Sequence, residues 1–173
     1  MKPVRSTLVL AALAAAALTA CGQSETASKL EPLEINQGTS CTLDGMLLVD
    51  YPGPKAQIHY AGQAEPEFFC DTVEMFNVYL KPEQVRAVRG LFVQDMGKAD
   101  WDQPRDHWID AKNAYYVHGS KRHGSMGPTI ASFAQEADAA KFATEYGGKV
   151  YRFADITPDM VVLDGGAQHD SSR

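Results

Sequence analysis

Cysteine is scarce in this sequence of 173 residues, which contains only three. Three are too few for a disulfide-rich scaffold, and the odd number raises the question of what the unpaired one does. Basic residues are also outnumbered, 16 against 22 acidic ones, which gives a formal net charge of −6. Nucleic-acid-binding domains usually present a basic surface, so this charge balance argues against a nucleic-acid partner. The remaining composition is that of an ordinary globular protein, which excludes collagen, coiled coil and wholesale disorder.

The familiar catalytic signatures are absent as well. The sequence contains no Gly-x-Ser-x-Gly, no phosphate-binding Gly-x-x-x-x-Gly-Lys, no Gly-x-Gly-x-x-Gly and no His-Glu-x-x-His. It also lacks Cys-x-x-Cys and Cys-x-x-Cys-His, which are typical of thioredoxin-like redox sites and of haem attachment. No motif therefore predicts an enzyme, and we expect a binding protein.

The N-terminus explains the first cysteine. Lys2 and Arg5 precede an apolar run over residues 8–18, which has the length of a signal-peptide core and is too short to span a bilayer. The run ends in Leu-Thr-Ala-Cys, which resembles the bacterial lipobox, so we expect a signal peptide over residues 1–20 and lipid attachment at Cys21. An ordinary secretory signal with an incidental cysteine is the alternative. Gly22 in place of Asp favours an outer-membrane anchor, with the protein on the periplasmic side of the envelope.

The rest of the chain divides into a tether, two units and a tail. Residues 21–38 are polar and lack an apolar period, so we expect a flexible tether between lipid and domain. Residues 39–98 and 99–164 are expected to form two small α/β units, and residues 165–173 a polar tail.

Each of the two units has the same expected order of elements. A strand, a helix and a strand follow a turn that contains Gly and Met, so we infer a degenerate duplication. A further strand is expected between the units, over residues 109–118. The expected elements of the first unit are a strand at 55–61, a helix from Asp71 or Thr72 to before Pro82, and a strand at 85–93; those of the second are a strand at 128–133, a helix at 135–146 and a strand at 149–154.

Soft metal ligands gather near glycines in two places. Cys41 and Met46 lie five residues apart across an Asp-Gly turn, and His118, His123 and Met126 share a loop rich in Gly and Ser. Thiol, thioether and imidazole donors favour Cu(I), because a polarisable d¹⁰ cation prefers polarisable donors; zinc seldom takes Met. The two methionines occupy matching turns of the two units, so loops facing each other could hold one metal ion.

Structural roles compete with ligation at each of these positions. Met46 could begin a buried strand over residues 46–49, and His118 and His123 could be solvated loop residues. Cys41 could form a disulfide with Cys70, because the periplasm permits disulfides. Cys70 itself follows two phenylalanines and is expected in or under the core.

Together, these motifs resemble the NosL family of copper-binding accessory lipoproteins of bacterial nitrous oxide reductase. The resemblance rests on the lipobox, the Cys-x-x-x-Gly-Met turn from Cys41, the Phe-Phe-Cys-Asp segment at 68–71 and the Gly-Ser-Met-Gly-Pro run at 124–128. It implies an α+β fold of two related small ββαβ units packed together, similar to that of organomercurial lyases. It also implies one Cu(I) per chain, delivered for assembly of the copper-sulfide centre of nitrous oxide reductase, the final recipient. The implied partners are an ABC-type membrane complex and its periplasmic subunit.

The sequence departs from the family pattern at one position. Many members carry Cys-x-x-Cys-Gly-Met, whereas Asp44 stands at the second cysteine position here. We therefore expect Cys41, Met46 and Met126 to bind copper, with His123 as a fourth candidate and Asp44 as a polar neighbour or replacement ligand. The rival hypotheses are a thiol-redox protein that uses Cys41 and Cys70, an organomercurial lyase with paired thiolates and a carboxylic acid, and a purely structural lipoprotein.

Overall fold

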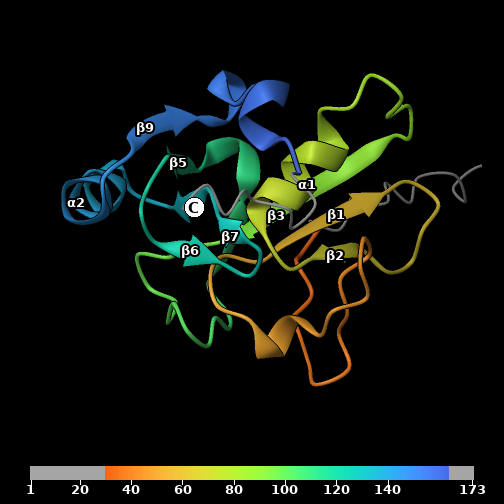
Figure 1. Ribbon diagram of the computed structural model, residues 1–173. Coiled ribbons are helices and arrows are strands. Elements are labelled where there is room, and N and C mark those ends of the chain that lie inside the picture. Colours follow the sequence, from red (N-terminus) through yellow and green to blue (C-terminus); the bar gives the residue numbers. More distant parts are fainter. Residues whose placement is uncertain (1–29, 164–173) are drawn as a thin grey trace, which may run out of the picture.

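A computed structural model describes residues 30–163 of the chain (Figure 1). The expected signal peptide, the lipidation site Cys21, the first part of the tether and the tail at 165–173 lie outside the described residues. Within residues 30–163, no helix has the length and apolar character needed to cross a membrane.

The first sheet has four antiparallel strands in the order β2-β1-β3-β4. Strand β1 lies between two others, and all five of its residues are buried. Helix α1 connects β2 to β3. The elements are β1 (Ala56–Tyr60), β2 (Glu67–Phe69), α1 (Thr72–Tyr79), β3 (Val88–Gln94) and β4 (Trp108–Asp110).

The second sheet has three antiparallel strands in the order β8-β5-β9, and helix α2 connects β8 to β9. A separate two-stranded ribbon, β6-β7, lies between β5 and β8 in the chain. The elements are β5 (Tyr115–His118), β6 (His123–Gly124), β7 (Gly127–Pro128), β8 (Ala131–Phe133), α2 (Glu136–Tyr146) and β9 (Lys149–Arg152). Short 3-10 helices cover Leu48–Asp50, Ala111–Asn113, Phe153–Asp155 and Pro158–Val161.

The two sheets share one topology. In each, the first strand lies in the middle, the second on one side, and the third, reached through the helix, on the other side. The expected α+β fold with two related ββαβ units is therefore confirmed. Strand β4 lies within the range assigned to the second unit, yet it pairs with β3 of the first sheet.

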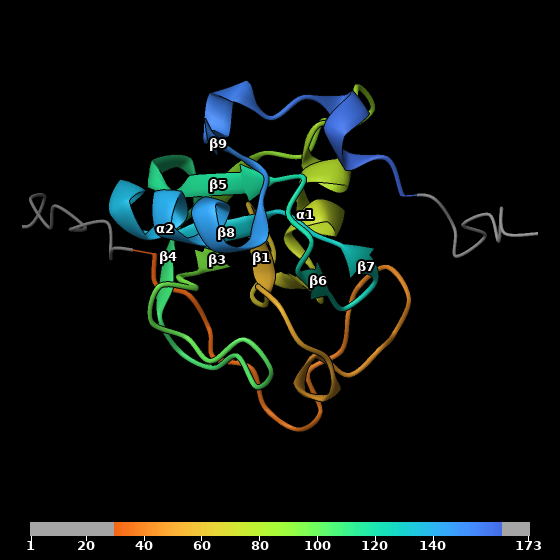
Figure 2. The same cartoon turned by 60° about the vertical axis from the view of Figure 1, so that its left-hand side comes forward.

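The two units lie side by side (Figure 2), and polar contacts and a common core join them. Ser132 of β8 donates its hydroxyl to the carbonyl of Gln94 at the end of β3, and its own carbonyl accepts from Met96 N. Phe76 of α1 packs edge-on against Tyr116 of β5 in the largest core cluster. The units therefore form one body.

Both expected helices are confirmed, because their boundary signals are local. The Asp71 carboxylate accepts a hydrogen bond from Val73 N and so caps α1, which ends before Pro82. Helix α2 ends at Gly147, whose positive φ of 79° is one that glycine adopts without strain.

Several expected strands were wrong in extent. The expected strand at 109–118 is two strands in different sheets, because the Asp110 carboxylate accepts from Lys112 N and stabilises a turn between them. The expected strand at 128–133 begins only at Ala131, since Pro128 belongs to β7. The buried strand considered at 46–49 is instead a single bridge, Ser40 to Leu47, followed by a 3-10 helix.

The described end of the expected tether packs against the body. Leu33 N donates to Gln57 Oε1 and Leu33 O accepts from Gln57 Nε2, both at 2.9 Å. Ile35 is buried in a small cluster with Cys41, Leu48 and Cys70. The residues from Leu33 onward therefore belong to the folded domain.

Candidate metal centre

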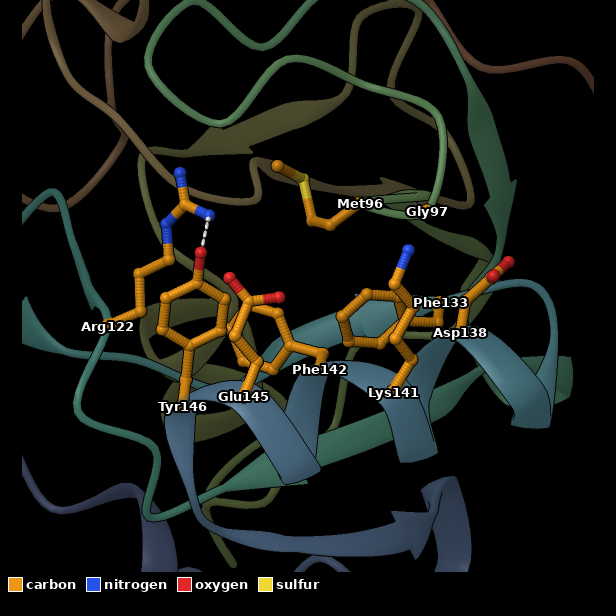
Figure 3. A pocket seen from close by; sticks show the side chains of 9 residues that line it. All are labelled: Met96, Gly97, Arg122, Phe133, Asp138, Lys141, Phe142, Glu145 and Tyr146. Atoms are coloured by element: carbon orange, nitrogen blue, oxygen red, sulfur yellow. Dashed lines mark hydrogen bonds between the residues drawn. The ribbon is translucent and has the colours of Figure 1, made fainter.

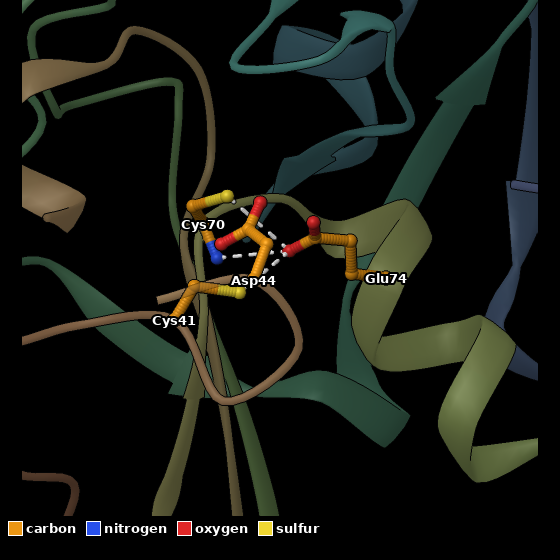
Figure 4. A group of neighbouring side chains, drawn as sticks. All are labelled: Cys41, Asp44, Cys70 and Glu74. Carbon is orange, nitrogen blue, oxygen red and sulfur yellow. Dashed lines mark hydrogen bonds between the residues drawn. The ribbon is translucent and has the colours of Figure 1, made fainter. Parts of the chain in front are cut away.

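Two thiols and two carboxylates converge at one end of the first unit (Figure 4). Cys41 and Cys70 are buried free thiols, and each Sγ lies 3.3 Å from Glu74 Oε2. The backbone N of Cys70 also donates to that oxygen, at 3.1 Å. One ligand atom each from Cys41, Asp44, Cys70 and Glu74 lies within 4.8 Å of the other three. This group is large enough and compact enough to hold a metal ion.

The turn from Cys41 to Met46 is closed by its own backbone. Cys41 N donates to Met46 O at 2.8 Å, and Gly45 N donates to Cys41 O at 2.9 Å. Gly45 has a φ of 77°, which explains glycine at this position. Asp44 Oδ1 accepts from Met46 N at 2.9 Å, as Asp side chains often do in turns. The thiol, the carboxylate and the thioether are thus carried by one closed turn.

Neighbouring elements bring this turn to the other thiol. Thr42 N donates to Phe68 O at 2.8 Å, which joins the turn to strand β2. Cys70 directly follows β2, and Glu74 comes one helical turn later, in the first turn of α1. The site therefore forms where the turn, the end of a strand and the start of a helix meet.

The acidic groups of the site shift one another's pKa values. The Cys70 thiol donates a hydrogen bond that lowers the pKa of Cys41 to about 6, although burial opposes this. The same interaction, together with burial, raises the pKa of Cys70. Burial, and then the charge of Cys41, raise the pKa of Glu74 to about 7. The pair of thiols therefore loses its two protons in separate steps, and Cys41 loses its proton first.

Lys55 provides a buried positive charge behind the thiols. Its side chain is fully buried, and Nζ donates to Pro52 O at 2.9 Å and to Cys70 O at 3.1 Å. Burial lowers the pKa of this ammonium to about 8, against the opposing effect of Asp71. Lys55 thus fixes the Cys70 backbone and partly balances the negative charge of the cluster.

The two methionines of the expected ligand set lie at different depths. Met46 is half-buried and packs against the cluster that contains Cys41 and Cys70. Met126 is 56% exposed, at the turn between β6 and β7. The preceding residue, Ser125, donates its hydroxyl to Cys70 O at 2.9 Å. The structure thus brings Met46 to the thiols and links the Met126 turn to the same backbone carbonyl.

The β6-β7 ribbon is held in place at Gly124. A Cβ on this residue would lie 2.3 Å from Asp71 Oδ2, and a Cβ on Gly53 would lie 2.7 Å from Gly124 Cα. Asp71 is itself fixed, because Oδ1 accepts from Val73 N and from Thr129 Oγ1 at 2.7 Å. Glycine at position 124 thus lets the ribbon approach the start of α1.

The histidines are not part of the compact ligand group in residues 30–163. His123 is exposed on β6, and its carbonyl, not its ring, accepts from Trp101 Nε1. His118 packs edge-on against Tyr151, with 6.2 Å between ring centroids. His59 Nε2 pairs with Gln57 Oε1 at 2.8 Å. Of the four expected ligands, the structure therefore groups Cys41 with Met46 and leaves His123 apart. The fourth, Met126, is exposed on the turn that Ser125 joins to Cys70 O.

Comparisons with known proteins agree with the fold and with these motifs. The sequence model of the NosL family matches residues 32–161. The chain belongs to the NosL family.

Named relatives cover most of the chain. The copper-binding lipoprotein NosL of Stutzerimonas stutzeri is 40% identical over 164 residues, 93% of this chain and 85% of the relative. That of Achromobacter cycloclastes is 40% identical over 162 residues, 91% and 83% of the two chains. The crystal structure of the copper chaperone NosL from Shewanella denitrificans superposes with a TM-score of 0.72 at 39% identity, covering 75% of this chain and 97% of that one.

A pocket lies against α2, away from the thiols (Figure 3). Its lining includes one sulfur, that of Met96, together with charged residues such as Lys141 and Glu145. Arg122 donates to the hydroxyl of Tyr146 at 3.0 Å on one side of it. Lacking a thiol and an imidazole, this lining does not suit a soft metal ion.

Sequence reasoning missed Glu74, Cys70 as a member of the site, and Lys55. The one available signal was the spacing of Cys70 and Glu74, which places them on neighbouring turns if a helix begins between them. Lys55 gave no such signal, because its burial follows from the packing around Cys70.

Proposed function

We propose that this protein binds Cu(I) as cargo and hands it to another protein, as a copper chaperone without enzymatic activity. The observation that carries the proposal is the convergence of two buried free thiols with a half-buried thioether, Met46, in one cluster. The names of its relatives, copper-binding lipoprotein and copper chaperone, support it.

The chemistry of the donors favours Cu(I). Thiolate and thioether sulfur select this soft ion over harder divalent ions. Cys41 is the thiolate donor, because the pKa of its thiol is lowered to about 6, and Met46 is the neighbouring thioether. Met126 completes a set of three sulfur ligands, with His123 as a further candidate and with Asp44, Cys70 and Glu74 as the surrounding acids. Such a site holds about one copper ion per chain.

Transfer of copper then proceeds by ligand exchange. The exposed Met126 lies at the protein surface, so a donor from the recipient can replace its thioether while Cys41 still holds the ion. No free ion is needed, because each new bond forms as an old one breaks. The recipients we propose are an ABC-type maturation complex with its periplasmic subunit and, finally, the copper-sulfide centre of nitrous oxide reductase. The protein would act on the periplasmic side of the envelope, anchored through lipid at Cys21, preferentially in the outer membrane.

Anaerobic titration with Cu(I) against a competing chelator tests the site. The wild type should bind about one equivalent tightly. Met46→Ala, Met126→Ala and Cys41→Ser should each bind at least about tenfold more weakly, because each loses a sulfur ligand. Met96→Ala is the matched control, since this methionine packs against a separate core cluster that contains Phe142 of α2, and its loss should leave the affinity unchanged. Copper X-ray absorption of Cys41→Ser should lack one short Cu–S contact.

Two results would contradict the proposal. If wild type shows no tight site, the protein does not carry Cu(I). If Met46→Ala and Met126→Ala both bind Cu(I) like wild type, the assignment of these two methionines as ligands is wrong.

Cleavage of carbon–mercury bonds is a second candidate. It requires paired thiolates and a carboxylic acid, and Cys41, Cys70 and Glu74 supply that set of groups. The half-buried Met46 beside the thiols favours copper, since such cleavage has no use for a thioether. Incubation with methylmercury and assay for released methane separates the two, and we expect no methane above a Cys41→Ser control.

A further inference from the structure

We propose that Cys41 and Cys70 form a reversible disulfide, and that this disulfide prevents the protein from binding copper. The first part of this proposal concerns the two cysteines alone. The second part, the loss of copper binding, rests on the proposed function.

The two sulfur atoms are already close. They lie within 4.8 Å of each other, and both are 3.3 Å from the same oxygen, Glu74 Oε2. A disulfide requires an S–S distance of about 2.05 Å and Cα atoms no more than about 7 Å apart. The hydrogen bond from Thr42 N to Phe68 O keeps the backbone of the turn beside the end of β2, so both cysteines are carried by neighbouring segments. Rotation of the two side chains and a small shift of the turn bring the sulfurs together.

The two thiols differ in their access to solvent, which sets the order of reaction. Cys41 is 3% exposed and is followed by four exposed residues at 42–45, whereas Cys70 is fully buried. An oxidant that displaces the exposed turn therefore meets Cys41 first. Cys70 is then the resolving cysteine, because it is the thiol next to Cys41.

The reaction balances as a thiol–disulfide exchange with an external disulfide, carried by a small molecule or by a thiol oxidoreductase. The Cys41 thiolate attacks one sulfur of that disulfide, forms a mixed disulfide and releases the first thiolate of the oxidant. Cys70 then attacks Cys41 Sγ, forms the internal disulfide and releases the second thiolate. Two electrons pass to the oxidant, which leaves as two thiols with the two protons of the cysteines. Glu74 Oε2 is positioned to accept the Cys70 proton, because it already accepts that hydrogen bond.

Oxidation and copper compete for the sulfur atom of Cys41. A disulfide sulfur has no thiolate charge to offer Cu(I), so the oxidised protein loses its strongest donor. A bound Cu(I) in turn occupies the Cys41 thiolate and prevents its attack on the oxidant. The copper-loaded protein is therefore protected from oxidation, whereas the copper-free protein can form the disulfide.

Equilibration of the mature lipoprotein with glutathione disulfide and glutathione, followed by alkylation and peptide mapping, tests the crosslink. Trypsin places Cys41 in the peptide of residues 30–55 and Cys70 in that of residues 56–86, so the disulfide appears as one crosslinked pair. Its mass should be that of the two peptides less two hydrogens, and dithiothreitol should separate them. Cys70→Ser is the control that retains Cys41 and should stop at the glutathione mixed disulfide.

The copper part is measured on the same samples. The oxidised wild type should bind Cu(I) at least about 100-fold more weakly than the reduced wild type, and reduction should restore the affinity. Preloading with one equivalent of Cu(I) should slow crosslinking by more than about tenfold. Circular dichroism of each variant checks that the fold is retained, and Cys41→Ser provides a second thiol-deficient variant if Cys70→Ser does not fold.

The outcomes separate this proposal from the proposed function. If the thiols are alkylated as free cysteines after oxidation, or if Cys41 stops at a mixed disulfide in the wild type, the proposal is overturned while copper binding stands. If the crosslink forms and the copper affinity is unchanged, the second part of the proposal, that the disulfide prevents copper binding, is refuted. If the reduced protein fails to bind Cu(I) but the crosslink forms, the proposed function fails and the redox pair remains.

Discussion

Gly124 offers a direct test of how the β6-β7 ribbon is held over the site. In Gly124→Ala the new Cβ would lie 2.3 Å from Asp71 Oδ2 and 2.9 Å from Thr129 Cβ, both far inside van der Waals contact. The carboxylate cannot turn away easily, because it is buried and Oδ1 is held by Val73 N and Thr129 Oγ1. The ribbon must therefore move instead.

The magnitude follows from the contacts that this movement disturbs. Overpacking of a buried site by one methyl group costs about 1–3 kcal/mol. Displacing the ribbon also breaks the hydrogen bond from Ser125 Oγ to Cys70 O, which contributes about 1 kcal/mol. We expect Gly124→Ala to lower the free energy of unfolding by about 2–4 kcal/mol in urea denaturation. The Cu(I) affinity should fall with it, because the shifted turn carries Met126.

Gly38→Ala is the matched control for this experiment. Its Cβ would meet only Asn36 Oδ1, at 3.5 Å, which is an ordinary contact. This variant should unfold within about 0.5 kcal/mol of wild type, as surface substitutions usually do. If Gly124→Ala also unfolds within that range, the ribbon is not held by close packing against Asp71, and the reasoning is refuted.

Two further predictions concern buried polar groups. Burial raises the pKa of Asp71 to about 6 from its ordinary 3.8, so in the metal-free protein its contribution to stability is complete below about pH 3.8 and is lost as the pH rises to about 6. This loss corresponds to about 3 kcal/mol of the free energy of unfolding. Urea denaturation from pH 4 to pH 7.5 should show a smaller decline in this free energy for Asp71→Asn than for wild type. Equal declines in the two proteins would show that Asp71 does not cause the pH dependence. Gln57→Ala should lower the free energy of unfolding by about 2–3 kcal/mol, because it leaves Leu33 N and O without their partner, and should speed amide exchange at residues 33–35. Gln63→Ala, at an exposed position, is its control, and unchanged exchange in Gln57→Ala would show that other contacts hold this segment.

Local signals predicted the helices well and the strands less well. The cap at Asp71, the stop before Pro82 and the glycine at 147 act within one helical turn, so the sequence alone locates both helices. The sequence predicts one strand over residues 109–118, yet β4 pairs with β3 in the first sheet, whereas β5 pairs with β8 and β9 in the second. Strand pairing depends on distant segments, which a local pattern does not contain.

By itself, the sequence determined the fold class, the duplication and the positions of the candidate soft ligands, because these depend on residues close together in the chain and on the family motifs. Only the tertiary structure decided which of these candidate ligands lie together. Cys41 and Glu74 are separated by 33 positions, and they come together because the turn at 41–46 packs over β2 and the start of α1. The same packing buries Lys55 behind Cys70. The two cysteines of the described domain thus lie at one carboxylate, that of Glu74, although 29 positions separate them in the chain.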